Sequence, residues 1–485
     1  MSAQAGSFLW HDYETFGTDP ALDRPAQFAA IRTDMALQQV AEPCTWYCRP
    51  ARDVLPHPFA CLVTRITPQE ATARGVPEAE FARRIHAEMM EPDTCGAGYN
   101  SLRFDDEFTR HLFYRNFFDP YEREWRNGNS RFDLINLTRM YYALRPEGIE
   151  WPEREPGQPS FRLEDLTSAN AIPHSGAHDA LADVRATIEL ARLLREANAR
   201  LFAWGLQMRD QARVMSLLNP LEARPLLHTS SRYPAARGCT TLVLPLAVMP
   251  ERPKSVIVFD LMSDPEPLLE LDAPTIADLV FTPAADLPEE LERIALKAVH
   301  TNKVPMVAPD TVLEGVDLDR IGLDPERCRR HARVLAQALA SVRLKVMDVY
   351  APTPFGTPVD PDVALYSGGF FSRRDRATLD RVLDTPPERL GESVWSFEDS
   401  RLPTLLFRYR ARNWPDTLTT VEAERWEAYR RGRLLEPTTP GQLSVADFRQ
   451  ELAEARKTSL GDGGANAILD QLEAWLLELG VGSEN

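Results

Sequence analysis

The sequence predicts an α/β protein that starts with a mixed-sheet domain and continues into a β-rich region and then a helical region. Three apolar segments bounded by turn residues predict successive strands at residues 7–16, 26–34 and 38–48. Segments with helical periodicity then alternate with short apolar segments, which is typical of an α/β domain with a mixed sheet. The pattern changes after about residue 200, and beyond a Pro-rich stretch at 350–363 it is almost wholly helical.

Apolar spacing predicts the remaining elements of the first domain. A helix is expected at 77–90, where Phe81, Ile85 and Met89 recur every four residues and therefore share one face. Further helices are expected at 104–118 and 178–197, and short buried strands at 94–100 (TCGAGYN) and 131–137 (RFDLINL). The segment 145–159 is rich in Pro and Gly and is expected to be a loop.

The region after residue 200 has fewer clear signals. The segments TTLVLPLA at 240–247 and SVIVFDL at 255–261 predict strands, because they are rich in β-branched residues and flanked by Pro or Gly. Helices are expected at 287–299 and at 324–340. This arrangement predicts a small β-rich second domain.

The length and composition indicate a globular protein of several domains. The chain has 485 residues, of which 44% are apolar and 26% are charged. No apolar segment approaches the roughly 18 to 20 residues of a membrane span, and the first ten residues lack the basic and apolar parts of a secretory signal. The six cysteines contain no CxxC pair, so we expect a reduced, cytoplasmic protein that is not bound to a membrane.

The formal net charge of −17 argues against a general electrostatic attraction to nucleic acid, although it leaves room for a local basic groove. Only five of the 55 basic residues are lysines, and the other fifty are arginines. Arginine suits phosphate binding. A genome whose base composition favours arginine codons explains the ratio as well, so the ratio carries no functional conclusion.

Two acids, Asp12 and Glu14, stand at the end of the first predicted strand, SFLWHDYET. Side chains alternate along a strand, so both carboxylates point to the same face. Two anions held close together in a partly buried place repel each other and require a positive partner. A Lys or Arg side chain is the ordinary partner, and Mg²⁺ is the alternative, because it prefers carboxylates together with water and substrate phosphate.

Further acids and a histidine occur in the same domain. Asp105 and Asp106 stand at a predicted helix start, where an aspartate more often caps the helix. His178 and Asp183 are five residues apart, which corresponds to about 140° around a helix axis. They can therefore converge only if His178 lies in the loop before the helix, as the sequence HSGAH allows. Asp179 is then the expected N-cap and Asp183 the acid that faces inward.

The ordered set D-x-E, a distant Asp and H-x₄-D resembles the DEDD 3′→5′ exonuclease superfamily in its histidine form. Longer segments narrow the resemblance to the bacterial exonuclease I family, whose members degrade single-stranded DNA. The resemblance to this family extends from about residue 7 to 480. The segments that carry it are FLWHDYETFGTDPALDRPAQFAAIRTD, GYNSLRFDDEFTRHLFYRNFFDPY, YALRPEGI, SFRLEDLT and FRYRARNWPDTL.

This resemblance implies three domains: an RNase H-like exonuclease domain over 1–198, an SH3-like β-barrel domain over 199–351 and a helical domain over 352–485. It also implies 3′→5′ hydrolysis of single-stranded DNA to nucleoside 5′-monophosphates by two Mg²⁺ ions, for which Mn²⁺ can substitute, in DNA repair and recombination. A monomer is expected. Its expected partners are single-stranded DNA and the acidic C-terminal tail of single-stranded DNA-binding protein.

The resemblance, together with two-metal chemistry, assigns roles to particular residues. Asp12, Glu14 and Asp183 would hold two Mg²⁺ ions roughly 4 Å apart. Asp105 would complete the acidic cluster, and His178 would accept the proton of the attacking water, because an unperturbed histidine pKa near 6.5 suits a general base.

Residues outside the acidic cluster are expected to contact DNA or the partner protein. Glu14, Thr15 and Phe16 would contact the 3′ end, and Arg162 the phosphate of the terminal nucleotide. For Arg162, a surface ion pair with Glu164 or Asp165 is the ordinary alternative. The candidates for base stacking, phosphate contact and partner binding are Trp125, Arg139 and Arg145, respectively. A place in the core is the alternative for Trp125.

Two other functions fit parts of the pattern. An RNA exonuclease or a proofreading subunit would carry the same catalytic set, but a bare catalytic domain needs only about 200 residues. A non-catalytic DNA-binding scaffold would have no need for all five residues. Cleavage of matched RNA and DNA oligomers, and release of mononucleotides that depends on Mg²⁺, distinguish these alternatives.

Overall fold

The computed structural model describes residues 6–176, 178–283, 286–288, 292–351 and 360–481. The chain divides into two compact units. The first contains residues 1–130, 175–185 and 355–485, and the second contains residues 131–174 and 186–354. Among the described residues, no helix combines the length and the apolar character that a membrane crossing requires. All six cysteines are free thiols.

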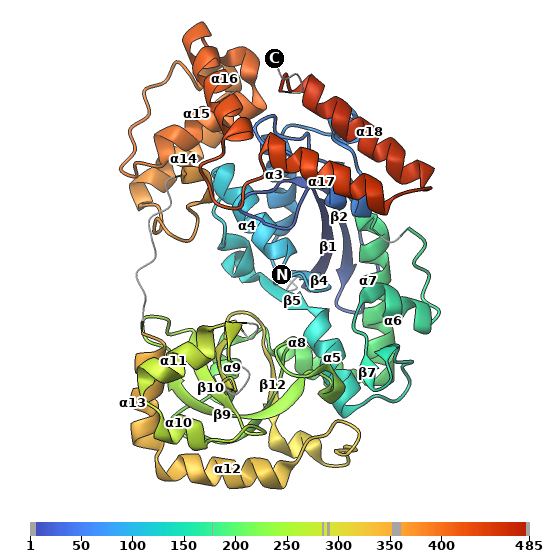
Figure 1. Cartoon of the computed structure of the whole chain (residues 1–485), viewed down its shortest axis with the longest axis vertical. Helices are drawn as coiled ribbons and strands as arrows, with labels where there is room; N and C mark the ends of the chain where they lie inside the picture. Colours follow the sequence, from blue (N-terminus) through green and yellow to red (C-terminus); the bar gives the residue numbers. More distant parts are fainter. Residues whose placement is uncertain (1–5, 177, 284–285, 289–291, 352–359, 482–485) are drawn as a thin grey trace, which may run out of the picture. The chain divides into compact units, whose positions relative to one another are not determined.

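A mixed sheet of five strands, in the order β3-β2-β1-β4-β5, carries the N-terminal acids (Figure 1). The central strand β1 pairs antiparallel with β2 and parallel with β4. The strands are β1 (Ser7–Thr15), β2 (Pro25–Asp34), β3 (Cys44–Tyr47), β4 (Thr94–Gly98) and β5 (Ser130–Asp133). The mixed-sheet α/β prediction is therefore confirmed.

Helices α3 (Glu78–Met89) and α4 (Asp105–Arg115) cover one face of this sheet. Their apolar side chains, including Phe81 and Ile85 of α3 and Leu112 of α4, form one buried cluster with Leu9, Tyr13 and Phe28 of the sheet. The expected periodicity of Phe81, Ile85 and Met89 is confirmed, because all three are buried. Two shorter helices, α1 (Pro58–Thr64) and α2 (Pro68–Arg74), precede α3.

Two predicted strands of this sheet are shorter than expected. The third was expected over 38–48, but only Cys44–Tyr47 is a strand, because the Asp34 side chain accepts the N–H groups of Ala36 and Gln38 and forms a turn. The strand expected over 131–137 ends at Asp133, whose carboxylate accepts the Ile135 N–H at 3.0 Å and caps a helix that begins at Leu134.

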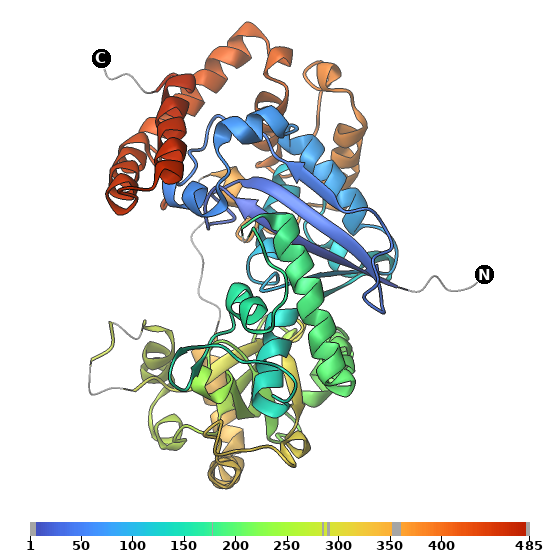
Figure 2. The ribbon, with the colours of Figure 1, turned by 90° about the vertical axis from the view of Figure 1, so that its right-hand side faces the viewer.

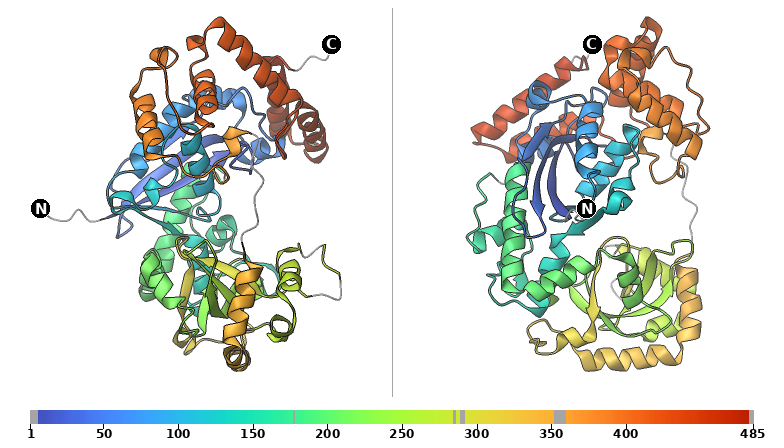
Figure 3. Two further views of the ribbon diagram at one scale, coloured as in Figure 1. Left: turned by 90° about the vertical axis from the view of Figure 1, so that its left-hand side faces the viewer. Right: turned by 180° about the vertical axis from the view of Figure 1, so that it is seen from behind.

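The C-terminal helices belong to the same unit as this sheet (Figure 1 and Figure 3). They are α14 (Arg373–Asp384), α15 (Leu402–Asn413), α16 (Thr420–Leu435), α17 (Val445–Thr458) and α18 (Gly463–Glu478), as the sequence predicted. A buried cluster joins Phe16, just after β1, to Leu434, Phe448 and Trp475 of these helices. The end of β1 is therefore packed against the C-terminal region.

The second unit is built around an antiparallel sheet of five strands, in the order β11-β10-β9-β8-β12. The strands are β8 (Leu226–Thr229), β9 (Thr240–Val248), β10 (Ser255–Asp260), β11 (Leu296–His300) and β12 (Met306–Pro309). The strands predicted at 240–247 and 255–261 are confirmed. The prediction of a helix over 287–299 is wrong where β11 pairs with β10, and residues 289–291 lie outside the described part of the chain.

Helices accompany this sheet in the second unit (Figure 2). The helix predicted over 324–340 is two helices, α12 (Pro325–Gln337) and α13 (Leu339–Val349). The others are α5 (Leu134–Leu144), α6 (Leu163–Ala169), α8 (Ala199–Gln207), α9 (Gln211–Leu217), α10 (Glu266–Glu270) and α11 (Ala273–Phe281), together with the small hairpin β6 (Glu153–Glu155) and β7 (Gln158–Pro159). Helix α7 (Ala180–Ala197) begins in the first unit and continues in the second.

Candidate metal centre and active site

Strand β1 places Asp12 and Glu14 on one face of the mixed sheet, as the period of two predicts. Glu14 is buried and Asp12 is half-buried. On β2 they stand opposite Ala29 and Gln27, respectively. Trp10 and Tyr13 of the same strand are buried and anchor it in the core. Two carboxylates are therefore held on a rigid central strand.

Asp105 joins these acids from the start of α4. Its carboxylate accepts a hydrogen bond from the backbone N–H of Tyr13 at 3.0 Å. Tyr13 is the residue between Asp12 and Glu14, so the Asp105 carboxylate lies against the part of β1 that carries both acids. Its neighbour Asp106 instead pairs with Arg123 at 2.6 Å, and both of those side chains are only 2% exposed. The two adjacent aspartates thus have different environments, and it is the Asp105 carboxylate that accepts the Tyr13 N–H of the strand that carries the paired acids.

The start of α7 brings a histidine and a fourth acid to the same place. The Asp179 carboxylate accepts the Ala182 N–H at 3.2 Å, which fits the expected N-cap. His178 therefore precedes the helix and Asp183 lies in its first turn. Gly176 and His178 both have positive φ angles, of 96° and 68°. This left-handed backbone conformation is uncommon for a histidine. It directs the His178 ring away from the position that a residue within the helix would give it.

Glu14, His178 and Asp183 come together as one group. Each offers a ligand atom, and these atoms lie within 4.8 Å of one another. The spacing of His178 and Asp183 in the sequence predicted that His178 lies in the loop and that Asp183 faces inward, and the positions of these ligand atoms agree with that prediction. Asp12 is outside this group of three but close enough to interact with it, because Asp105, Glu14 and Asp183 all raise its pKa.

The electrostatics of the site favour a bound cation. Burial, followed by the neighbouring carboxylates of Asp183 and Asp105, raises the pKa of Glu14 to about 9. Burial, followed by Asp105 and Glu14, likewise raises the pKa of Asp12 well above its usual range. Such acids ionise together only when positive charge neutralises them. Carboxylate oxygens with one imidazole suit a divalent metal ion, so the residues present fit the metal that the sequence predicts.

The other residues predicted in the first unit lie in different environments. The Thr15 hydroxyl donates to the Gly17 carbonyl at 2.6 Å. The Phe16 side chain is buried in the cluster with the C-terminal helices, and its backbone N–H donates to the Arg24 carbonyl at 2.9 Å. Trp125 is 65% exposed, so the alternative of a core position for this residue is wrong.

Three predicted residues belong to the second unit. Arg162 is exposed at the start of α6, and within the described residues no ion pair joins it to Glu164 or Asp165. Arg139 is half-buried, donates to the Asn136 side chain at 2.8 Å and lies 5.7 Å from the Phe161 ring. Arg145 ends α5 and lines a hollow of this unit.

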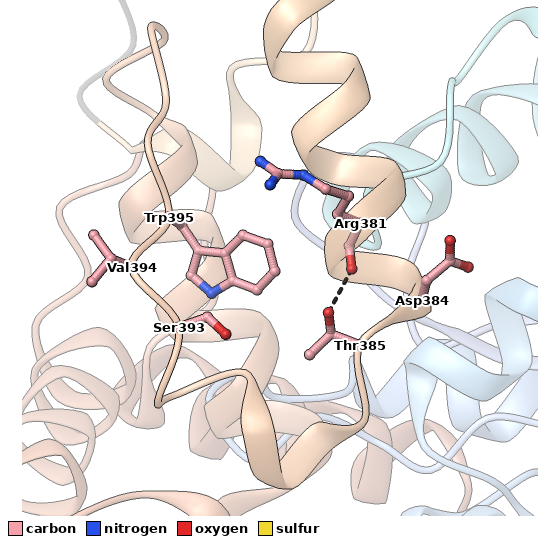
Figure 4. A pocket seen from close by; sticks show the side chains of 6 residues that line it. All are labelled: Arg381, Asp384, Thr385, Ser393, Val394 and Trp395. Atoms are coloured by element: carbon pink, nitrogen blue, oxygen red, sulfur yellow. Dashed lines mark hydrogen bonds between the residues drawn. The ribbon is translucent and has the colours of Figure 1, made fainter.

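The predicted acids do not line the described surface hollows. One hollow of about 520 Å³ lies in the C-terminal region between the end of α14 and the segment 393–395 (Figure 4). Its lining is Arg381, Asp384, Thr385, Ser393, Val394 and Trp395. With one carboxylate among these side chains, it lacks the acid cluster of a metal site.

One buried polar residue beside the site was not predicted. Gln27 is 1% exposed, stands opposite Glu14 on β2, and bonds to the first residue of α7. The sequence contained one sign of its importance, because Gln27 is a lone amide within the otherwise apolar segment AQFAAI.

The fold and these residues define a metal-dependent 3′→5′ exonuclease: paired acids on a central strand, an aspartate held against that strand, and a histidine and an aspartate at a helix start. Three family models match the chain in order. They are "Exonuclease" over 9–191, "Exonuclease I SH3-like domain" over 209–352 and "Exonuclease I C-terminal domain" over 359–479.

Relatives match over nearly the whole chain. Exodeoxyribonuclease I of Escherichia coli is 49% identical over 88% of this chain and 90% of its own length, and that of Haemophilus influenzae is 44% identical over 98% of both. Exonuclease I from Methylocaldum szegediense has a similar structure, with a TM-score of 0.93, 49% identity and coverage of 98% of this chain and 99% of its own.

Solved structures of the E. coli enzyme include complexes with single-stranded DNA. Its complex with a dA16 oligonucleotide has a TM-score of 0.93 and 46% identity over 98% of this chain and all of that chain. Another is a zinc-bound form of its complex with single-stranded DNA. The chain belongs to the exodeoxyribonuclease I family and is a 3′→5′ exonuclease of single-stranded DNA.

Proposed function

We propose that the chain releases nucleoside 5′-monophosphates from single-stranded DNA with two Mg²⁺ ions, for which Mn²⁺ can substitute, held by Asp12, Glu14 and Asp183. The observation that carries this proposal is the group of ligand atoms of Glu14, His178 and Asp183 within 4.8 Å, next to an Asp12 carboxyl whose pKa is raised by its neighbours. When bound, the ions supply positive charge that activates the attacking water and stabilises the leaving 3′ oxygen.

The side chains around this group have distinct tasks. His178, in the loop before α7, accepts the proton of the attacking water. Asp105 is fixed by the Tyr13 N–H and adds negative charge that favours metal binding. Asp183 is carried by the first turn of α7, so its position depends on how the beginning of that helix is held.

Contacts to the DNA strand follow from exposure and chemistry. Thr15, Phe16 and Glu14 lie where the 3′-terminal nucleotide binds, with Phe16 contributing its backbone. Arg162 and Arg139 contact phosphate. The Trp125 indole offers a stacking surface for a base. In the same unit Phe370 is 83% exposed and packs edge-on against Tyr121, with ring centroids 5.8 Å apart, so it offers a second exposed aromatic ring.

A local basic cluster in the second unit suits the phosphate backbone despite the charge of −17. Three of the five lysines, Lys254, Lys297 and Lys303, occur on or beside the strands β10 and β11. Burial, followed by Lys303, Arg252 and Lys297, lowers the pKa of His300, so these three cations lie in the neighbourhood of His300. We infer that this cluster binds the DNA strand.

A hollow of about 560 Å³ in the second unit fits the expected partner peptide. Arg145 and Arg200 provide positive charge, while Leu144, Leu201 and Trp204 provide apolar surface. An acidic tail is complementary to the two cations of this lining. We infer that the tail of single-stranded DNA-binding protein docks here, and that the enzyme is a cytoplasmic monomer of DNA repair and recombination.

The test is the variant Asp12→Ala, with Asp384→Ala as an exposed control outside the acid cluster. We expect Asp12→Ala to abolish release of mononucleotides from a labelled DNA oligomer while single-strand binding stays close to that of the wild type. Retention of more than a few per cent of wild-type turnover would refute the metal assignment. Faster cleavage of a matched RNA oligomer would favour an RNA exonuclease, and no Mg²⁺-dependent release by the wild type would favour a scaffold.

A further inference from the structure

A row of three side chains crosses the sheet next to the acid cluster. Glu14 of β1 stands opposite Gln27 of β2, which in turn stands opposite Tyr47 of β3. Directly opposed residues of antiparallel strands point to the same face, so the three side chains are neighbours. Gln27 is thus the residue between a candidate metal ligand and the edge strand.

Both ends of the Gln27 amide are used. Its Nε2 donates to the Tyr47 hydroxyl at 2.7 Å, and its Oε1 accepts the backbone N–H of Ala180 at 3.1 Å. The backbone N–H of Ala180 can only donate, which fixes the orientation of the amide. A hydrogen-bonded amide that is almost fully buried has a single well-defined position, because losing either partner leaves a buried polar group unsatisfied.

Ala180 is the first residue of α7. The first N–H groups of a helix have no partner within the helix, and each needs a bond from outside. Asp179 satisfies the Ala182 N–H, and Gln27 satisfies that of Ala180. His178 precedes Ala180 by two residues and Asp183 follows it by three, so the Gln27 bond lies in the middle of the segment that carries both.

Tyr47 holds Gln27 from the other side. Its ring is buried, and the Arg74 guanidinium lies over it at 3.9 Å from the ring centroid. The chain of contacts therefore runs from α2 through Tyr47 and Gln27 to the start of α7. Figure 1 shows β1 and β2 side by side.

From this geometry we propose that Gln27 is a positioning residue, which holds the beginning of α7 so that His178 and Asp183 stay at metal-binding distance from Glu14. This inference rests on the proposed metal site and adds to it a residue that contacts neither metal nor DNA. Partners that orient metal ligands typically contribute a factor of about 10 to 100 in metal affinity or activity.

The test uses Gln27→Met, which keeps the length of the side chain but removes both hydrogen bonds. Mn²⁺ binding to the full chain, followed by the electron paramagnetic resonance signal of the free ion, should weaken about tenfold. The half-saturating Mg²⁺ concentration for hydrolysis should rise in parallel, while DNA binding without metal stays unchanged. Tyr47→Phe, which keeps the Ala180 bond, should give a smaller effect of the same kind.

The matched control is Gln39→Met, the same change at an exposed glutamine whose side chain donates to the Ala41 carbonyl. A Gln27→Met protein that is less heat-stable but binds Mn²⁺ as well as the wild type would overturn the proposal and make Gln27 a purely structural residue. If Gln27→Met fails to fold, unchanged Mn²⁺ binding by Tyr47→Phe and by the shorter Gln27→Asn overturns it. If wild type and Asp183→Asn bind Mn²⁺ equally, the proposed metal site itself is wrong.

Discussion

The backbone N–H of Tyr13 donates to the Asp105 carboxylate at 3.0 Å, which ties the start of α4 to the strand that carries Asp12 and Glu14. The next residue, Asp106, has no part in this contact and is buried in a pair with Arg123. Adjacent aspartates of the same helix start therefore have different partners.

The substitutions Asp105→Asn and Asp106→Asn should affect different properties, the first turnover and the second stability. Asp105→Asn keeps an oxygen for the Tyr13 N–H but removes a charge from the acid cluster, so turnover should fall about 10- to 100-fold with little change in stability. Asp106→Asn leaves Arg123 buried without its anion and should lower the free energy of unfolding by about 3 kcal/mol while turnover persists. Denaturant unfolding and single-turnover cleavage measure the two effects. Equal loss of turnover in both variants would contradict this division.

His178→Ala should reduce turnover far more than DNA affinity. Loss of a general base removes about 10² to 10⁴ in rate, and raising the pH should restore part of it because hydroxide then forms without the base. Single-turnover cleavage of a labelled oligomer against pH measures this. His174→Ala, at a histidine that bonds to the Thr167 hydroxyl, is the control. If the His178→Ala variant no longer binds metal, His178 is a metal ligand. If the variant cleaves at the wild-type rate at every pH, His178 is not the general base.

The stability of the metal-free protein should depend on pH through Glu14. Its pKa in the folded protein is raised to about 9 from an ordinary value of 4.5, mainly by burial. Between these values the folded chain binds more protons than the unfolded chain, so the free energy of unfolding should fall as pH rises. Thermal unfolding without metal measures this, and Glu14→Gln should flatten the dependence.

Metal binding should reverse this trend. The carboxyls of Glu14 and Asp12 must lose protons when a cation binds, so Mg²⁺ should stabilise the protein more at pH 9 than at about pH 6. Calorimetry in buffers of different ionisation enthalpy should detect the released protons. Absence of proton release at neutral pH would show that the acids are already ionised in the metal-free protein.

Affinity for single strands should fall with salt despite the net charge of −17, with a slope of about −0.7 in log–log terms for each phosphate neutralised. Lys254→Gln and Lys297→Gln should each make this slope shallower by about that amount. Burial, then Arg232, lowers the pKa of Lys297 to about 7, so its contribution should be larger at lower pH. Lys457→Gln, at an exposed lysine paired with Glu454, is the control. An unchanged slope in both variants would exclude the basic cluster from the DNA path.

Local patterns predicted the features that depend on neighbouring residues. The period of two along a strand predicted that Asp12 and Glu14 share one face. The five-residue spacing of His178 and Asp183 predicted that His178 lies in the loop and Asp183 in the helix. Features that depend on distant partners were not predictable. Residues 296–299 fit a helical pattern, but pairing with β10 makes them a strand. Nothing local distinguishes Asp105 from Asp106, since the packing of α4 decides which one meets β1.

The cluster that joins Phe16 to Leu434, Phe448 and Trp475 has a consequence for synthesis of the protein. Part of the packing around Phe16 comes from residues more than 400 positions later in the chain. While the ribosome is still making the middle of the protein, Phe16 has only the N-terminal members of this cluster, such as Leu55 and Cys61, to pack against. A nascent or prematurely terminated chain therefore lacks the part of this cluster that the C-terminal helices supply, and we expect hydrolytic activity to emerge only when translation is nearly finished.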